Sequence, residues 1–250
     1  PMMLLDVGNT TLRWAFRDGG QLAGQGSVVH RGHDTGNLIG QAWAGLDAPD
    51  RMAVSNVAGR PLQDAITRWA DEHWNLQPVF VRTGDRAAGV TNGYTVPGQL
   101  GVDRWAAMVA AWHEQQTSVL VIDCGTAITI DYVDAGGRHR GGLIAPGLDT
   151  MRQSLSQNTA NIDILPADEA RPVNPFSEGT EAAIRNGTLC MCTAMIDRVT
   201  TDLADRAGSS VRAVLTGGDA PVIQPLLGYW TVHDPDLVLK GVAILVEDQA

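Results

Sequence analysis

One short pattern occurs twice in this chain of 250 residues and limits what it can fold into. In each copy an apolar run leads into an Asp-x-Gly turn with a small polar residue, and a second β-rich run follows. Asp6 and Gly8 of the first copy correspond to Asp123 and Gly125 of the second, an offset of 123 − 6 = 117 residues. One such turn is weak evidence, because turns use these residues widely. Two copies at matched places predict two similar α/β halves.

The halves are expected at residues 1–115 and 116–250, as mixed sheets flanked by helices with a cleft between them. The two turns would then face each other and hold a polyphosphate and its cation from both sides. Hydrophobic periodicity and turn residues predict the elements. The expected strands cover residues 2–7, 12–17, 26–30, 53–57, 78–82, 118–133 and 213–219, the last ending in a glycine turn. The expected helices cover residues 61–74, 103–114, 179–205 and 237–248.

The composition favours a globular protein and argues against nucleic acid as a partner. Hydrophobic residues make up 44% of the chain, enough for a core. The formal net charge of -10 repels phosphate backbones, although nucleotide sites built from backbone N–H groups and metal ions stay possible. No run approaches the roughly 20 apolar residues of a membrane span, and the first residues show no secretory signal. We therefore expect a cytoplasmic protein without a membrane partner.

The cysteines and histidines give no metal site. Cys124, Cys190 and Cys192 are an odd number without the spacing of a disulfide framework, which suits a reducing compartment. Cys190 and Cys192 lie two residues apart in an expected helix, so they point to different faces, and buried thiols are favoured over a metal site. His30 and His33 lack a third ligand nearby and are expected at the surface.

The chain contains one lysine, Lys240, which excludes the commonest phosphate-binding loop. A P-loop needs Lys after Gly and before Ser or Thr, and Lys240 stands between Leu239 and Gly241. If this protein binds ATP, it therefore holds the phosphates in another way.

Asp6 has two interpretations. It is either a turn former that accepts from nearby backbone N–H groups, or a carboxylate that holds Mg²⁺ directly or through water beside a nucleotide phosphate. In the second case Asn9, Thr10 and Thr11 supply donors to phosphate oxygens, and Gly8 lets the backbone approach closely. Asp123 and Thr126 have the same pair of interpretations. Asp123 ends an apolar run, so we expect it to be partly buried, with a cation as one possible partner.

Asp103 also has two interpretations. An Asp before an Ala-rich segment is a good helix N-cap. The loop that leads into it, residues 84–101, is long and rich in Gly, Thr, Asn and Pro, and such loops are often functional. Asp103 can accept a proton from an attacking hydroxyl, and Arg104 can pair with a carboxylate. The glycine turn at 216–219 is either a plain strand-to-helix turn or a flat surface for an adenosine.

Several segments, taken together and in order, resemble the type III pantothenate kinases, a branch of the acetate and sugar kinase and actin-like ATPase superfamily. The resemblance covers the whole chain. It is carried by Asp6-Val-Gly8-Asn9-Thr10, Tyr94-x-x-Pro97-x-x-Leu100-Gly101-Val-Asp103-Arg104, Asp123-x-Gly125-Thr126-Ala127, Gly141-Gly142-x-Ile144-x-Pro146-Gly147, Gly179-Thr180, Thr216-Gly217-Gly218 and Leu237-Val-Leu-x-Gly241.

The resemblance implies two halves of the ribonuclease H-like, actin-like ATPase fold and ATP-dependent phosphorylation of pantothenate, the first step of coenzyme A synthesis. It implies Mg²⁺ and a monovalent cation, K⁺ or NH₄⁺, as cofactors, and a homodimer. The residues implied for ATP phosphates and Mg²⁺ are Asp6, Val7, Gly8, Asn9, Thr10, Thr11, Leu12 and Arg13, with Thr126 also on ATP. Those implied for pantothenate are Tyr94, Gly101, Val102, Asp103, Arg104 and Thr180. Asp103 would be the general base, and Asp123 would bind the monovalent cation.

Two rival functions remain open at this point. One is a kinase of the same superfamily that phosphorylates another small hydroxyl compound, such as a sugar. The other is a non-catalytic regulator, which the low positive charge and the presence of both Asp103 and Asp123 disfavour.

Overall fold

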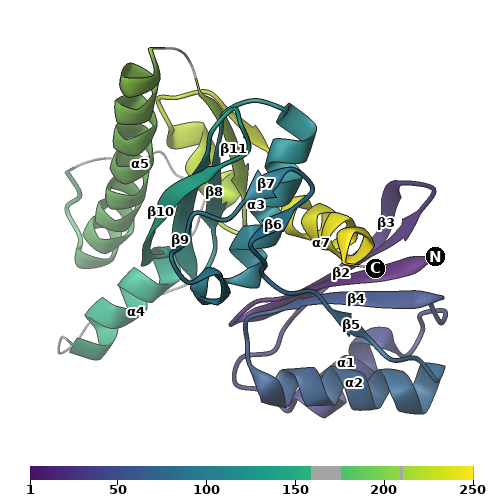
Figure 1. The fold of residues 1–250 in the computed structure, drawn as a ribbon. Helices are drawn as coiled ribbons and strands as arrows, with labels where there is room; N and C mark the ends of the chain where they lie inside the picture. The colour runs from purple at the N-terminus through teal and green to yellow at the C-terminus, as the bar shows by residue number, and fades with distance from the viewer. Residues whose placement is uncertain (159–175, 209–210, 250) are drawn as a thin grey trace. The chain divides into compact units, whose positions relative to one another are not determined.

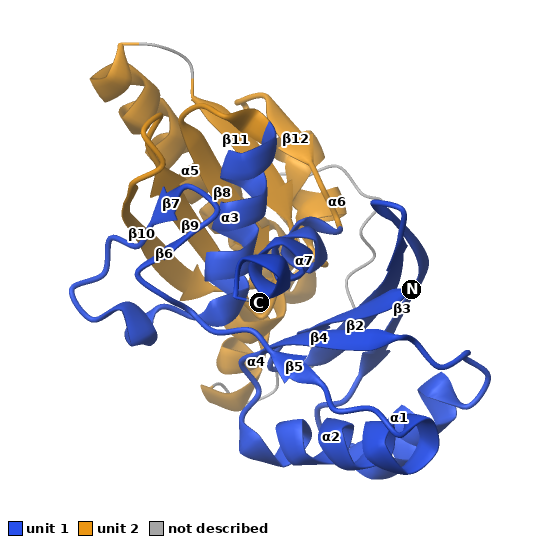
Figure 2. Cartoon of the chain, turned by 45° about the vertical axis from the view of Figure 1, so that its right-hand side comes forward, with its two compact units in different colours: residues 1–114, 236–250 blue, residues 115–235 orange. Residues whose placement is uncertain are grey.

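The computed structural model describes residues 1–158, 176–208 and 211–249. They form two compact units, residues 1–114 with 236–250 and residues 115–235, shown in two colours in Figure 2. Each unit contains a five-stranded mixed sheet flanked by helices. The predicted α/β class with two similar halves is therefore confirmed.

The sheet of the first unit has the strand order β3-β2-β1-β4-β5. Its strands are β1 (Met2–Val7), β2 (Thr11–Asp18), β3 (Gln21–Val29), β4 (Arg51–Asn56) and β5 (Val79–Phe80). Strands β1, β2 and β3 pair antiparallel through tight turns, whereas β4 pairs parallel with both β1 and β5. The parallel pairs need helical crossovers, which α1 (Thr35–Trp43) and α2 (Arg60–Trp74) supply.

Alternating side chains give this sheet two different faces. Met3, Leu5 and Val7 of β1 pack with Trp14, Trp43 and Trp69 in one core cluster against α1 and α2. The indole rings of Trp43 and Trp69 meet edge to face at 5.2 Å between centroids. The last helix, α7 (Leu237–Asp248), packs against β1 and β4. Figure 1 shows α1 and α2 on one side of this sheet and α7 on the other.

The remainder of the first unit leads from β5 into a helix. Two short strands, β6 (Arg86–Ala87) and β7 (Val90–Thr91), and the 3₁₀ turn η1 (Pro97–Gln99) lie within the predicted long loop. Helix α3 (Val102–Gln115) follows. Its middle is Ala-rich and buried, so the helix forms from high propensity and packs closely.

The second unit repeats the topology of the first, with strand order β10-β9-β8-β11-β12. Its strands are β8 (Val119–Cys124), β9 (Ala127–Val133), β10 (His139–Pro146), β11 (Arg212–Thr216) and β12 (Thr231–His233). Strand β8 pairs antiparallel with β9 and parallel with β11, as β1 does with β2 and β4. The first strands of the two sheets lie 117 residues apart, so the offset read from the two Asp-x-Gly turns also relates the strands.

Helices α4 (Leu148–Asn158), α5 (Thr180–Ala207) and α6 (Ala220–Ile223) cover one face of this sheet, and the 3₁₀ turn η2 (Gln224–Leu226) follows α6. Leu148, Leu189 and Ile223 from these helices pack on Ile122 and Ile130 of the strands. Cys192 is buried in this core, but Cys190 is exposed. The prediction that the two thiols point to different faces is confirmed, and the prediction that both are buried is wrong for Cys190.

Two results differ from the sequence-based expectations. The predicted halves, 1–115 and 116–250, place the last helix with the C-terminal half, whereas residues 236–250 group with the first unit. Helix α7 does so because its apolar residues cover the face of β1 and β4, and because Arg17 of β2 pairs with Glu247. Helices α1 and α4 were not predicted, since glycine or polar residues interrupt their apolar pattern. No described helix has the length and hydrophobicity needed to cross a membrane.

Candidate active site

The first Asp-x-Gly turn connects β1 and β2 and is held by hydrogen bonds to its own carbonyl groups. The amide of Gly8 donates to the carbonyl of Thr11 at 3.0 Å, and the amide of His30 donates to the carbonyl of Thr10 at 2.9 Å. Asn9 is exposed, and Thr10 and Thr11 are half-buried. Because these carbonyl oxygens already accept hydrogen bonds from protein N–H groups, they are directed away from a bound anion. The turn is therefore suited to binding phosphate.

The turn also depends on His30, which the sequence led us to expect at the surface. Its Nε2 lies 2.7 Å from the carbonyl oxygen of Gly8, so this nitrogen carries the proton and donates. His30 is half-buried, whereas His33 is exposed as expected. The expectation for His30 is wrong because β3 ends beside the turn, and only the folded hairpin brings residues 8 and 30 together.

The eight residues predicted around ATP phosphates are not equivalent in the structure. Val7 and Leu12 are fully buried in the tryptophan-rich core, so only their backbone groups are available to a ligand. Asp6 of β1 and Arg13 of β2 are register partners in the antiparallel ladder. Their side chains project from the face of the sheet opposite to the tryptophan-rich core. The guanidinium of Arg13 lies 3.6 Å from the carboxylate of Asp236, which directly precedes α7.

Asp103 lies in the first turn of α3, because the helix begins one residue earlier, at Val102. Its Oδ1 accepts from the amide of Arg104 at 2.7 Å. A Cβ atom at position 101 would lie only 2.7 Å from the same oxygen, so glycine leaves room for the carboxylate. Asp103 therefore satisfies one amide of the first turn and is held at a helix N-terminus, where backbone N–H groups without helical partners point outward.

Arg104 and Tyr94 form a second part of this site. The Arg104 side chain is buried, its Nη1 donates to the Tyr94 hydroxyl at 3.0 Å, and its guanidinium lies 5.6 Å from the Tyr94 ring centroid. Asn92 holds the loop that carries Tyr94. Its side-chain oxygen accepts from the Tyr94 amide, and its Nδ2 donates to the carbonyls of Gly84 and Pro97. The long loop is thus ordered around an arginine, and a guanidinium held this way is suited to a carboxylate.

In the second unit, the turn from Asp123 to Thr126 is closed by its neighbours. The Thr126 carbonyl accepts from the amide of Gly147 at 3.0 Å and from the hydroxyl of Thr150 at 2.7 Å. Asp123 is half-buried, as the sequence predicts, and Thr126 is exposed. The turn therefore presents one carboxylate and one hydroxyl residue from a backbone fixed at the start of α4.

Two glycines make this close arrangement possible. A Cβ atom at position 147 would lie 2.0 Å from the carbonyl oxygen of Gly125. At Gly217, which has a φ of 94°, a Cβ atom would lie 2.5 Å from Asp123 Oδ1. The amide of Asp219 donates to the carbonyl of Cys124 at 2.9 Å. The glycine turn after β11 is thus packed against the end of β8, beside the predicted cation ligand.

Thr180, the remaining predicted pantothenate residue, is the first residue of α5 and is exposed. The structure therefore places Asp6 to Arg13, Tyr94 and Gly101 to Arg104 in the first unit, and Asp123, Thr126 and Thr180 in the second.

The residues present fit Mg²⁺ better than a metal that needs several protein ligands. Among the described residues, no group of three or more His, Cys, Asp or Glu is placed to hold a metal ion. Magnesium usually takes one or two carboxylates, retained waters and substrate phosphates. Asp6 at the start of a polar turn matches that requirement.

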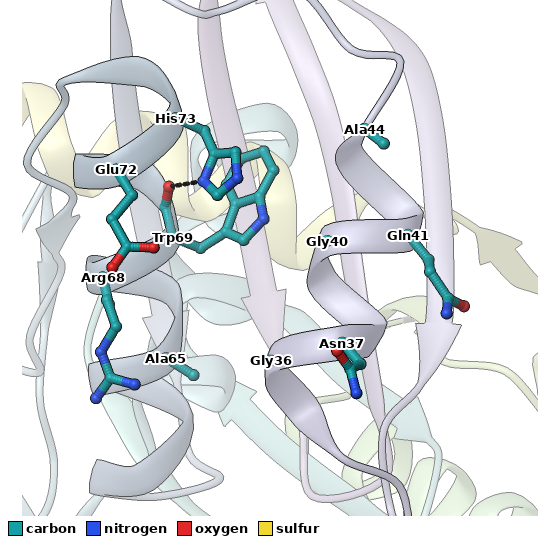
Figure 3. Close-up of a pocket in the computed structure, with 10 residues that line it drawn as sticks. All are labelled: Gly36, Asn37, Gly40, Gln41, Ala44, Ala65, Arg68, Trp69, Glu72 and His73. Carbon is teal, nitrogen blue, oxygen red and sulfur yellow. Dashed lines mark hydrogen bonds between the residues drawn. The ribbon is translucent and has the colours of Figure 1, made fainter.

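A groove elsewhere on the first unit contains none of the predicted residues. It has a volume of about 560 Å³ and lies between α1 and α2, with Gly40 on one side and Trp69 and His73 on the other (Figure 3). The His73 ring stacks on Trp69 at 4.3 Å between centroids.

A family model and the sequence relatives of this chain indicate the same family. A family model described as type III pantothenate kinase matches residues 2–202. A type III pantothenate kinase from Nitrosococcus oceani is 37% identical over 252 residues, covering 99% of this chain and 94% of the relative. Another from Alkalilimnicola ehrlichii is 37% identical over 253 residues and covers 98% of each.

Solved structures support the fold. A Baf family protein from Campylobacter jejuni, a candidate transcriptional activator, has a TM-score of 0.62 at 18% identity and covers 99% of this chain and 98% of its own. The ethanolamine utilization protein EutJ from Carboxydothermus hydrogenoformans has a TM-score of 0.56 at 14% identity and covers 98% and 90%. Identities this low are evidence of a shared fold alone. The family itself follows from the sequence relatives, so the chain belongs to the type III pantothenate kinases and is an enzyme of the kinase class.

Proposed function

We propose that this protein transfers the γ-phosphoryl group of ATP to the hydroxyl of pantothenate, which yields 4'-phosphopantothenate in the first step of coenzyme A synthesis. The observation that carries the proposal is the pair formed by Asp103 and Arg104 at the start of α3 (hydrogen bonds as described above). Pantothenate has a hydroxyl at one end and a carboxylate at the other. The two adjacent residues offer a base for the hydroxyl and a cation for the carboxylate.

In the acceptor site, Asp103 accepts the proton of the attacking hydroxyl. Arg104, held by the Tyr94 hydroxyl, pairs with the pantothenate carboxylate. Gly101 and Val102 shape the backbone beside the substrate, and Thr180 contributes a hydroxyl from the start of α5. General-base catalysis of this kind typically contributes about 10²- to 10⁴-fold in rate.

In the ATP site, the turn from Asp6 to Arg13 and the residue Thr126 hold the phosphates. Asp6 would hold Mg²⁺, directly or through water, and Asp123 would hold K⁺ or NH₄⁺. When bound, these cations would neutralise charge on the transferred group, while the protein supplies mainly position and electrostatic stabilisation, as phosphoryl transfer requires. No lysine of a P-loop is needed in this arrangement.

The assembly and location are further parts of the proposal. We infer a homodimer, as the resemblance to the family implies, and the cytoplasmic location stays a prediction from composition and cysteine usage.

The deciding experiment measures ADP release from ATP with pantothenate and with a panel of sugars, each with Na⁺, K⁺ or NH₄⁺ as the monovalent cation. We expect turnover with pantothenate and a clear increase with K⁺ or NH₄⁺. Activity with a sugar and none with pantothenate would refute the substrate assignment. Equal turnover in Na⁺ and K⁺ would refute the role of Asp123 while leaving the substrate intact.

A further inference from the structure

We propose that Ser55 is a positioning residue for the Asp6 carboxylate, and this inference rests on the proposed role of Asp6 at the divalent cation. Ser55 lies near the end of β4 and pairs with Asp6 of β1 in parallel register. Neither sequence pattern nor family resemblance singled it out.

Ser55 and Asp6 project from the same face of the sheet. Leu5, Val7 and Val54 belong to the core cluster under α1 and α2. Because side chains alternate along a strand, Asp6 and Ser55 point to the opposite face, where α7 packs. Neighbouring strands are about 4.8 Å apart, so the hydroxyl of Ser55 is within reach of the carboxylate of Asp6 after a rotamer change.

The Ser55 hydroxyl is unusual in its surroundings. The residue is 0% exposed, and within the described part of the chain its Oγ has no hydrogen-bond partner. Buried hydroxyls in folded proteins almost always have one, because an unsatisfied buried donor is destabilising. The Ser55 hydroxyl lies beside the Asp6 carboxylate. We infer that the two form a hydrogen bond when the carboxylate turns toward a cation.

The second unit carries the same pair at the same register. Thr216 of β11 pairs in parallel with Asp123 of β8, as Ser55 pairs with Asp6, and Thr216 is buried. The surrounding strands differ in sequence, yet a buried hydroxyl residue stands beside the cation carboxylate in both. This recurrence favours a role tied to the carboxylate over a role in packing.

The chemistry assigned to Ser55 is simple. Its Oγ–H donates to one oxygen of the Asp6 carboxylate and leaves the other oxygen directed at the cation or its bound water. Residues that hydrogen-bond a ligating carboxylate typically change metal affinity by about 10- to 100-fold when they are removed. Ser55 touches neither the phosphates nor the acceptor in this role.

The test measures the binding of the non-hydrolysable analogue AMPPNP by calorimetry, once with Mg²⁺ and once with EDTA. The ratio of the two affinities is the gain due to Mg²⁺. We expect Ser55→Ala to reduce this gain about tenfold and to leave the affinity in EDTA unchanged. Without ligand, the urea midpoint of Ser55→Ala should equal or exceed that of the parent, because an unsatisfied hydroxyl has been removed.

Two further variants make the result specific. Thr200→Val removes a buried hydroxyl of α5 in the second unit, one that donates to the carbonyl of Ile196, and should keep the full gain from Mg²⁺. Asp6→Asn should lose it. An unchanged gain in Ser55→Ala, or a lower urea midpoint without ligand, would overturn the inference. If Asp6→Asn loses the gain and Ser55→Ala keeps it, the inference about Ser55 fails alone. If Asp6→Asn also keeps it, the proposed metal role of Asp6 fails with it.

Discussion

At the scale of single residues, the first question is whether Asp103 acts as a base or only stabilises its helix. Its Oδ1 accepts from the Arg104 amide, so a role in the helix start is real. Asparagine keeps an oxygen acceptor at this position but cannot take a proton from a hydroxyl. The substitution therefore separates the two roles.

We expect Asp103→Asn to reduce turnover by about 100-fold or more while AMPPNP affinity stays within about twofold. Steady-state kinetics with pantothenate and calorimetry with AMPPNP measure the two quantities. Asp149→Asn is a matched control, because Asp149 is also an acid in the first turn of a helix and is exposed. Turnover near the parent value in Asp103→Asn would remove Asp103 as the base.

His30 gives a second prediction at this scale. His30→Ala removes the donor to the Gly8 carbonyl and should raise the KM for ATP severalfold, because the turn loses a bond that fixes it. His30→Gln places an amide donor at nearly the same point and should recover most of that loss. Exposed His33 offers the control His33→Ala, with kinetics equal to the parent. Equal effects of Ala and Gln at position 30 would contradict a role for this hydrogen bond.

At the scale of elements, helix α5 carries two cysteines in contrasting environments. Burial, together with the charge of Asp219, raises the pKa of the Cys192 thiol to about 11 although Arg152 acts in the opposite direction. Burial raises the pKa of Cys124 in β8 further, with Asp123 and Asp219 adding to it. Cys190 is exposed on the other face of the helix. One helix therefore separates a reactive thiol from a protected one.

In the native protein at pH 8, we expect one thiol in three to react with dithionitrobenzoate, and no thiol to react in Cys190→Ser. Only thiolates react, and the raised pKa of the buried Cys192 keeps its thiol protonated at that pH. Any fast-reacting thiol in Cys190→Ser would refute the burial of Cys124 and Cys192.

The raised pKa of Cys192 also makes the free energy of unfolding depend on pH in the alkaline range. Thiols of the unfolded chain ionise near pH 8.5, whereas Cys192 in the folded protein stays protonated until about pH 11. Its contribution to the free energy of unfolding is complete below pH 8.5 and is lost between these values. Urea unfolding at several pH values should show a smaller loss over this range in Cys192→Ala than in the parent.

At the scale of the whole molecule, the last helix completes the packing of the first unit. Helix α7 belongs to the first unit although it comes after all of the second in sequence. Within the first unit it packs against α3 so closely that a Cβ atom at Gly241 would lie 2.0 Å from the carbonyl oxygen of Ala106. Lys240 next to it pairs with Glu114 at 2.9 Å.

Gly241→Ala should therefore destabilise the protein by about 1–3 kcal/mol, because a methyl group meets backbone that cannot move away cheaply. Urea unfolding followed by circular dichroism measures this change. Gly187→Ala is the control, since Gly187 is also inside a helix but has open space around it, and it should stabilise by about 0.5–1 kcal/mol. Equal stability of Gly241→Ala and the parent would show that α3 and α7 shift apart without cost.

Local sequence patterns were sufficient to predict the duplicated α/β architecture and most strands and helices, and they supplied the residue types of the candidate site. They did so because strand alternation, turn residues and the Asp-x-Gly repeat are local, and local preferences agree with the final fold here. Four features became evident from the folded chain alone: His30 donates to the Gly8 carbonyl, Ser55 stands beside Asp6, Val7 and Leu12 face the core, and α7 joins the first unit. Each of these depends on strand register or on packing between segments up to more than 200 residues apart (as between β2 and α7), and no local pattern encodes such a pairing.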